Sequence, residues 1–160
     1  MSRRVWFPLR AGLIALGLSC ISWAAQAEGG HMPNVTPLPK YTQECAACHV
    51  AYPPGLLPAP SWQRIMGRLD KHYGTDASLD AASVQQISGW LQANAGTSRR
   101  GREEPPQDRI TRSAWFVREH DEVPANVWKR ASIKSAANCA ACHSGAAQGN
   151  YSEHGVRIPS

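Results

Sequence analysis

The pentapeptide Cys45-Ala46-Ala47-Cys48-His49 is repeated without change as Cys139-Ala140-Ala141-Cys142-His143. In a C-x-x-C-H unit the two thiols can form thioether bonds with the two vinyl groups of one haem, and the adjacent histidine can then bind the iron. Two such units predict two covalently bound haem c groups. The predicted attachment residues and first iron ligands are Cys45, Cys48 and His49 for one haem, and Cys139, Cys142 and His143 for the other.

Zinc sites and redox-active thiols are the alternatives to haem. Cysteine pairs that share a zinc ion usually lie roughly 15–20 residues apart, whereas these pairs lie about ninety residues apart. Zinc would also leave both adjacent histidines unexplained, and a thioredoxin-like thiol pair needs a βαβ context that the sequence does not indicate. The identical residues in both copies favour haem over zinc or a structural disulfide.

The N-terminus has the pattern of a secretory signal peptide. Three arginines precede or flank an apolar stretch at 11–18, and Ala25-Gln26-Ala27 forms a small-x-small cleavage site. Residues 1–27 are therefore predicted to be cleaved, leaving a periplasmic protein. A retained anchor is disfavoured because a span needs about 20 apolar residues, and lipidation at Cys20 is disfavoured because the residues before it are a poor lipobox.

Signal cleavage changes both the cysteine count and the charge. It removes Cys20, so the remaining four cysteines all belong to the two motifs. The signal carries three of the 17 Lys and Arg residues and none of the 12 Asp and Glu residues, which leaves 14 basic against 12 acidic residues. No stripe of basic residues interleaved with aromatics remains, so nucleic-acid binding is not expected. No stable membrane insertion is expected either.

The rest of the chain predicts a mostly α protein with two small haem-centred parts. Helices are expected over 40–50, from a cap at Ser61 toward His72, from a cap at Asp80 to residue 95, over 111–119, and around the second motif. No stretch has a convincing strand pattern. The predicted divisions are a flexible N-terminus at 28–39, a first haem domain at 40–96, a polar and solvated linker at 97–109, and a second haem domain at 110–160.

The sixth ligand of each iron decides the function. His72 and His120 each follow an apolar helical stretch, so they are the predicted distal ligands of the first and second haem, although a crossed pairing is open. Met66 shares a helix face with Ile65 and Leu69 and is predicted to pack in the core. The remaining candidates, His31, Met32 and His154, lie near the chain ends and are disfavoured.

Four stretches together resemble the soluble dihaem cytochrome c family called DHC. They are ECAACHVAYPPGLLPAP (44–60), WQRIMGRLDKHYGTDASLD (62–80), WFVREHDEVP (115–124) and SAANCAACHSGAAQGNY (135–151). The resemblance implies an N-terminal haem domain like a class I cytochrome c and a small, distinctive C-terminal haem domain. It also implies bis-histidine ligation by His49, His72, His120 and His143, and redox partners such as an oxygen-binding c-type haem protein and a membrane cytochrome b.

The resulting hypothesis is a periplasmic electron carrier rather than an enzyme. Electrons would pass from a membrane quinol-linked donor through two bis-histidine haems to a haem protein acceptor. The alternative is a peroxidase-like dihaem enzyme or a gas-binding protein, which would need one iron with an open site. A subunit of a larger reductase is a third possibility.

Overall fold

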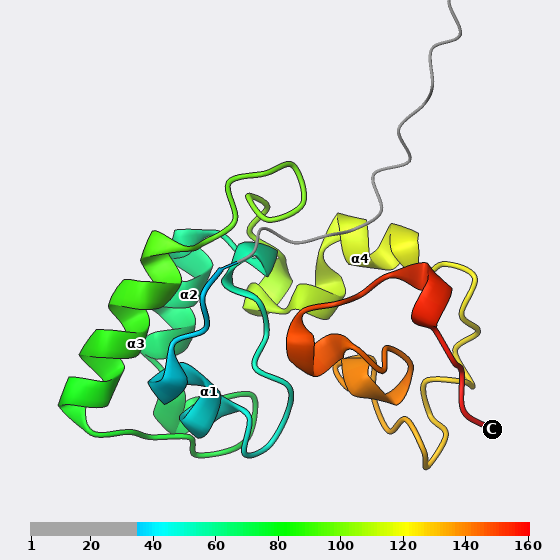
Figure 1. Cartoon of the computed structure of the whole chain (residues 1–160), viewed down its shortest axis with the longest axis horizontal. Helices are drawn as coiled ribbons and strands as arrows, with labels where there is room; N and C mark the ends of the chain where they lie inside the picture. The colour runs from blue at the N-terminus through cyan, green and yellow to red at the C-terminus, as the bar shows by residue number, and fades with distance from the viewer. Residues whose placement is uncertain (1–34) are drawn as a thin grey trace, which may run out of the picture.

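The computed structural model describes residues 35–160 (Figure 1). The predictions for the signal peptide, Cys20, His31 and Met32 lie outside the described residues, as does most of the predicted flexible segment. None of the helices within residues 35–160 has the length and apolar character needed to cross a bilayer.

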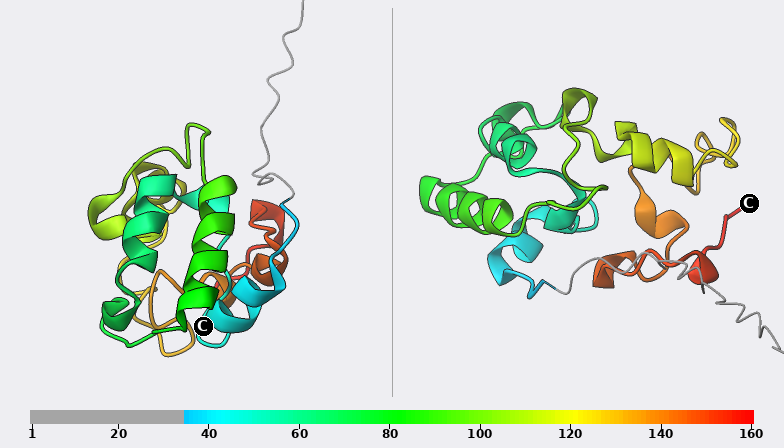
Figure 2. Two further views of the ribbon diagram at one scale, coloured as in Figure 1. Left: turned by 90° about the vertical axis from the view of Figure 1, so that its left-hand side faces the viewer. Right: turned by 90° about the horizontal axis from the view of Figure 1, so that it is seen from above.

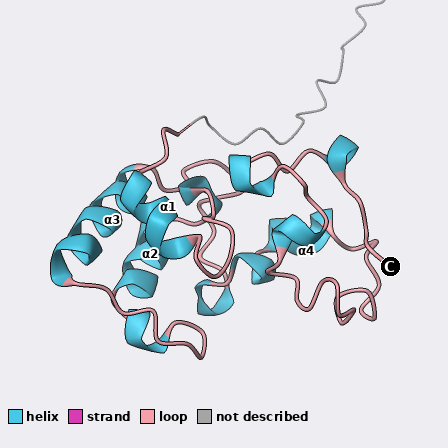
Figure 3. Ribbon diagram, turned by 60° about the horizontal axis from the view of Figure 1, so that its bottom comes forward, coloured by secondary structure: helices cyan, strands magenta, loops and turns pink. Residues whose placement is uncertain are grey.

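The described part of the chain is helical, as predicted. Its α-helices are α1 (Pro39–Cys45), α2 (Ala59–Met66), α3 (Ala81–Ala93) and α4 (Ala114–Glu119). Short 3₁₀ turns lie between and after them, at Pro54–Leu56, Leu69–Lys71, Pro106–Asp108, Ile110–Arg112, Cys139–Ala141, Ala146–Gln148 and Glu153–Gly155. Between residues 35 and 160 there is no strand, and only two isolated bridge pairs occur (Figure 3).

The main core lies in the N-terminal part, where α2 packs beside α3 and α1 contacts α3 (Figures 1 and 2). The buried side chains that form it are Tyr41, Leu57, Trp62, Met66, Ile87 and Leu91. The prediction that Met66 packs in the core is therefore confirmed. Ile110 also packs against this cluster, so the chain returns to the first core after the polar run.

Local capping signals explain where α3 begins but not where α2 does. Asp80 caps α3 by accepting a hydrogen bond from the Ser83 amide at 3.0 Å, as the sequence predicted. In contrast, α2 begins at Ala59, and the predicted cap Ser61 lies buried inside the helix. The first turn of a helix tolerates proline, because a backbone N–H there has no partner within the helix. Pro58 and Pro60 therefore set the start of α2 three residues earlier than predicted.

The second motif does not lie on the predicted α-helix. After α4 the chain runs through turns, and Cys139–Ala141 forms a single 3₁₀ turn. Lys134 has a φ of 69°, and the Asn138 side-chain amide donates to the Ile133 carbonyl oxygen at 3.0 Å. Such left-handed residues and side-chain bonds to the backbone compete with helix formation.

Most of the polar run at 97–109 is exposed, as its composition suggested, but contacts with the first core hold it in place. Arg64 on α2 pairs with Glu104 at 2.7 Å and with Asp108 at 2.6 Å. Gly101 is buried where its backbone touches those of Gly55 and Gly96. The run is therefore fixed against the first core, because ion pairs and a close backbone approach hold it there.

Candidate haem-binding sites

The first motif follows directly from α1, which ends at Cys45. His49 lies in the loop beyond, and its Nδ1 is 2.7 Å from the Val50 carbonyl oxygen. Donation by Nδ1 to this carbonyl leaves Nε2 free to bind a metal. The nearby Pro54 carbonyl oxygen accepts from the Trp62 indole at 2.7 Å.

His72 is delivered by a turn rather than by the end of a long helix. The predicted helix toward His72 ends at Met66, and a 3₁₀ turn at Leu69–Lys71 then leads into the histidine. Tyr73 and Gly74 follow with positive φ angles of 50° and 100°. This reversal fixes His72 beside the first motif, because glycine adopts such angles without a steric penalty.

His120 lies at the predicted place, directly after the last residue of α4. Its Nδ1 is 2.9 Å from the Phe116 carbonyl oxygen, and its ring lies over the Phe116 ring with the centroids 4.0 Å apart. Ser113 caps α4 by accepting from the Phe116 amide at 3.3 Å. The short helix therefore holds both the position and the tautomer of this imidazole.

The four predicted histidines form two local pairs. The ring centroids of His49 and His72 are 6.2 Å apart, and so are those of His120 and His143. A crossed pairing would need His72 beside His143, and the structure places His72 beside His49 instead. The ring planes meet at 20° in the first pair and at 73° in the second, so the two pairs differ in the relative orientation of their imidazoles.

Both pair separations fit one iron between two imidazoles. A metal–imidazole bond of about 2.0 Å, plus about 1.1 Å from nitrogen to ring centre, gives about 6.2 Å between the centroids of two opposed ligands. Between residues 35 and 160 no three His, Cys, Asp or Glu side chains converge as they would around a zinc ion. Each histidine pair therefore has a separation that fits one iron between two imidazoles, whereas the described residues show no cluster of three or more such side chains.

Unpartnered polar atoms at the second site also fit a bound haem. Within the described residues, His143 Nδ1, Trp115 Nε1 and the Tyr151 hydroxyl are buried without a hydrogen-bond partner. Leaving a buried donor unpaired costs free energy, so native structures rarely tolerate it. The carboxylates of haem propionates are suitable acceptors for Trp115 and Tyr151. A cavity of about 330 Å³ lies beside His143 and Asn150.

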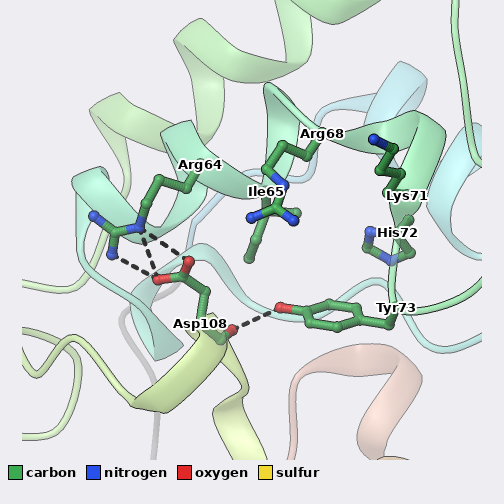
Figure 4. Close-up of a pocket in the computed structure, with 7 residues that line it drawn as sticks. All are labelled: Arg64, Ile65, Arg68, Lys71, His72, Tyr73 and Asp108. Atoms are coloured by element: carbon green, nitrogen blue, oxygen red, sulfur yellow. Dashed lines mark hydrogen bonds and ion pairs between the residues drawn. The ribbon is translucent and has the colours of Figure 1, made fainter.

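The first site has cations at its rim. Arg68 and Lys71 line a shallow pocket with His72, while Arg64 in the same pocket is already bound to Asp108 (Figure 4). Lysine and arginine bind carboxylates through charge-assisted hydrogen bonds. Arg68 and Lys71 are therefore the residues that could hold the propionates of the first haem.

Burial shifts the pKa values of three groups at the two sites. Burial lowers the pKa of His72, and the nearby His49 and Arg109 lower it further. Burial also lowers the pKa of His143, and His120 adds to this shift. A neutral imidazole is the form that binds a metal. Burial also raises the pKa of the Cys45 thiol to about 11, unlike the low pKa of a redox-active thiol pair.

Tyr52 is a site residue that sequence reasoning missed. Its ring lies over that of His49 with the centroids 4.7 Å apart, and its hydroxyl donates to the Ala137 carbonyl oxygen at 2.7 Å. Its position three residues after His49 is the only sequence signal that could have singled it out. The bond to Ala137 joins residues far apart in the sequence, and no local pattern predicts it.

The tryptophans divide into two groups. Trp62 is buried in the first core, and Trp90 packs against Tyr41 with the ring centroids 5.0 Å apart. Trp115 and Trp128 lie at the second site, where Trp128 is 5.8 Å from the His120 ring. Of these four tryptophans, Trp128 lies beside a predicted haem ligand.

The chain matches the family model of dihaem cytochrome c over residues 41–151. It is 46% identical to the crystal structure of DHC from Rhodobacter sphaeroides, with a TM-score of 0.64, covering 73% of this chain and 99% of that chain. It is 36% identical to the dihaem cytochrome c of Shewanella baltica OS155, with a TM-score of 0.66, covering 76% of this chain and 93% of that chain. No curated protein matches the chain. The chain therefore belongs to the dihaem cytochrome c family, and it carries two covalently bound c-type haems as a cytochrome of electron transfer.

Proposed function

We propose that both irons of this dihaem electron carrier have two histidine ligands, His49 with His72 and His143 with His120. The observation that carries the proposal is the 6.2 Å centroid separation of each pair. That separation leaves room for one iron and no room for a substrate between the iron and the second imidazole. The proposed role is therefore outer-sphere electron transfer without an enzymatic step at iron.

The haem supplies a one-electron iron couple when it is bound, and the protein's residues set its surroundings. The Val50 and Phe116 carbonyl oxygens hold the tautomers of His49 and His120. Packing against Tyr52 and Phe116 limits rotation of the same two rings. Ligands that are held in this way keep the same positions in both oxidation states, which keeps the reorganisation on electron transfer small.

Export to the periplasm and the redox partners are part of the same proposal. The N-terminal charge and apolar pattern supports export. The family relationship supports a quinol-linked membrane donor, such as a membrane cytochrome b, and a haem protein acceptor, such as an oxygen-binding c-type haem protein. Stopped-flow mixing of the reduced protein with a purified acceptor of that class tests the assignment, and oxidation no faster than by a noncognate cytochrome would contradict it.

The decisive experiment is visible absorption of the oxidised and reduced protein with and without carbon monoxide. Two low-spin haems that carbon monoxide does not alter are expected, with no methionine–iron charge-transfer band. H72A and H120A are each expected to let carbon monoxide bind one of the two haems, while H154A, which changes an exposed histidine, leaves both unaltered. A carbon monoxide shift in the wild-type protein would favour a gas-binding or peroxidase-like function.

Electron paramagnetic resonance distinguishes the two sites. The angle between axial imidazole planes sets the splitting of the low-spin iron d orbitals. Nearly parallel planes at 20° predict a rhombic signal for the first haem, and planes at 73° predict a strongly anisotropic signal for the second. A single type of low-spin signal from both haems would contradict these ligand geometries.

A further inference from the structure

Tyr52 contacts the first haem motif and the residue two positions before the second motif. Its ring is offset-stacked on that of His49, with the centroids 4.7 Å apart and the planes at 19°. Its hydroxyl donates to the carbonyl oxygen of Ala137 at 2.7 Å, across 85 residues of sequence. Ala137 lies two residues before Cys139, so one side chain connects the first proximal histidine with the start of the second motif.

The contact continues to the second haem attachment point. Cys139 Sγ lies 3.7 Å from the same Ala137 carbonyl oxygen. The path from His49 therefore runs through the Tyr52 ring, one short hydrogen bond and one carbonyl to the sulfur that would form a thioether. Each of these steps is a van der Waals contact, a hydrogen bond or a covalent bond.

Tyr52 is held at both ends. Its own carbonyl oxygen accepts from the Tyr41 hydroxyl at 2.7 Å, and Tyr41 is only 4% exposed within the first core. Tyr73 is a second tyrosine beside a predicted ligand of the first haem, and it meets His72 edge-on at 5.0 Å. The Tyr73 hydroxyl bonds the Asp108 carbonyl oxygen at 2.9 Å in the polar run, and this bond does not lead to a motif.

We propose that Tyr52 is a positioning residue that couples electron exchange between the two haems, an inference that rests on the bis-histidine carrier described above. In the exchange one electron moves: one iron goes from Fe(II) to Fe(III) while the other goes from Fe(III) to Fe(II). No bond forms or breaks. The Tyr52 hydroxyl keeps its proton, and its ring is neither oxidised nor reduced.

The test is the rate of intramolecular exchange in half-reduced protein, measured by NMR exchange spectroscopy of the haem methyl groups. Y52F removes only the hydroxyl, and a several-fold slower exchange is expected. Y52W and Y52L remove the same bond, so the test does not depend on the folding of one variant. Y52L also removes the stacked ring and is expected to exchange most slowly.

Y73F is the matched control. Tyr73 also lies beside a predicted iron ligand, and its hydroxyl also donates to a backbone carbonyl oxygen, but this bond is not on the proposed path. Its exchange rate is expected to equal that of the wild type. Each variant is also characterised by redox titration and by unfolding. The midpoint potentials give the driving force for exchange, and the unfolding midpoints show whether the variant is folded. The inference would be overturned if Y52F and Y52L exchanged electrons at the wild-type rate, or if Y73F slowed the exchange as much as Y52F does. Unaltered low-spin spectra of the variants would leave the bis-histidine assignment intact.

Discussion

Replacing Gly101 with alanine is expected to destabilise the protein through the junction where the polar run meets the first core. A Cβ on Gly101 would overlap the Gly55 carbonyl oxygen and lie 2.7 Å from the Gly96 Cα. Carbon atoms normally contact at about 3.5–4.0 Å. All these neighbours are backbone atoms, so no side chain can move aside.

The magnitude follows from the cost of overpacking, which is typically about 1–3 kcal/mol. The matched control is G89A, because Gly89 lies in the exposed face of α3 with nothing within 4 Å of its Cβ position. In a helix interior, glycine is less favourable than alanine by about 0.5–1 kcal/mol, so G89A is expected to stabilise the protein. The same substitution should therefore have opposite signs at the two positions.

The assay is urea unfolding of the oxidised protein, followed by far-ultraviolet circular dichroism and by haem absorbance. G101A should have a lower midpoint than the wild type, with an unchanged slope, and G89A a higher one. In thermal unfolding, each kcal/mol of lost stability corresponds to a Tm lowered by about 3 °C for a chain of this size. A G101A protein as stable as the wild type would refute the close backbone approach.

Three further predictions concern the second-site helix, the ion pairs and the first iron. S113A should lower the free energy of unfolding in urea by about 1–2 kcal/mol. It removes a buried helix cap whose hydroxyl also donates to the Ile110 carbonyl oxygen at 2.8 Å. Arg64 lowers the pKa of Asp108, so the stability that this carboxylate contributes is complete above its unfolded pKa and is lost as the pH falls through its lower folded pKa. R64A should therefore lose less stability than the wild type between pH 7 and pH 3 in urea midpoints, and an equal loss would contradict the pairing. H72M should raise the midpoint potential of one haem in a redox titration and leave the other unchanged, since methionine ligation raises the potential; unchanged potentials of both haems would argue against His72 as an iron ligand.

Local signals in the sequence predicted the features that are determined locally. The Asp80 cap, the apolar spacing of α3 and the burial of Met66 each depend on residues within a few turns of helix. His72 and His120 were singled out because each follows an apolar helical stretch, and the structure places each beside a motif histidine. Their role as ligands stays a prediction.

Two features that the sequence did not predict have different causes, one long-range and one local. The polar composition of 97–109 suggested a solvated linker, but ion pairs to Arg64 and the approach of Gly101 to Gly55 fix it in place. The expected helix at the second motif was wrong, because side-chain bonds to the backbone and a left-handed residue replace it with turns. Neither effect has a periodic pattern that a sequence window could detect.

The fixed polar run determines where the protein could be divided for the study of single-haem fragments. A cut at residue 96, where the helical pattern ends, would remove Gly101 from its backbone contacts and both acidic partners from Arg64. It would also uncover the core surface on which Ile110 packs. An N-terminal fragment that keeps these contacts must therefore extend through Ile110.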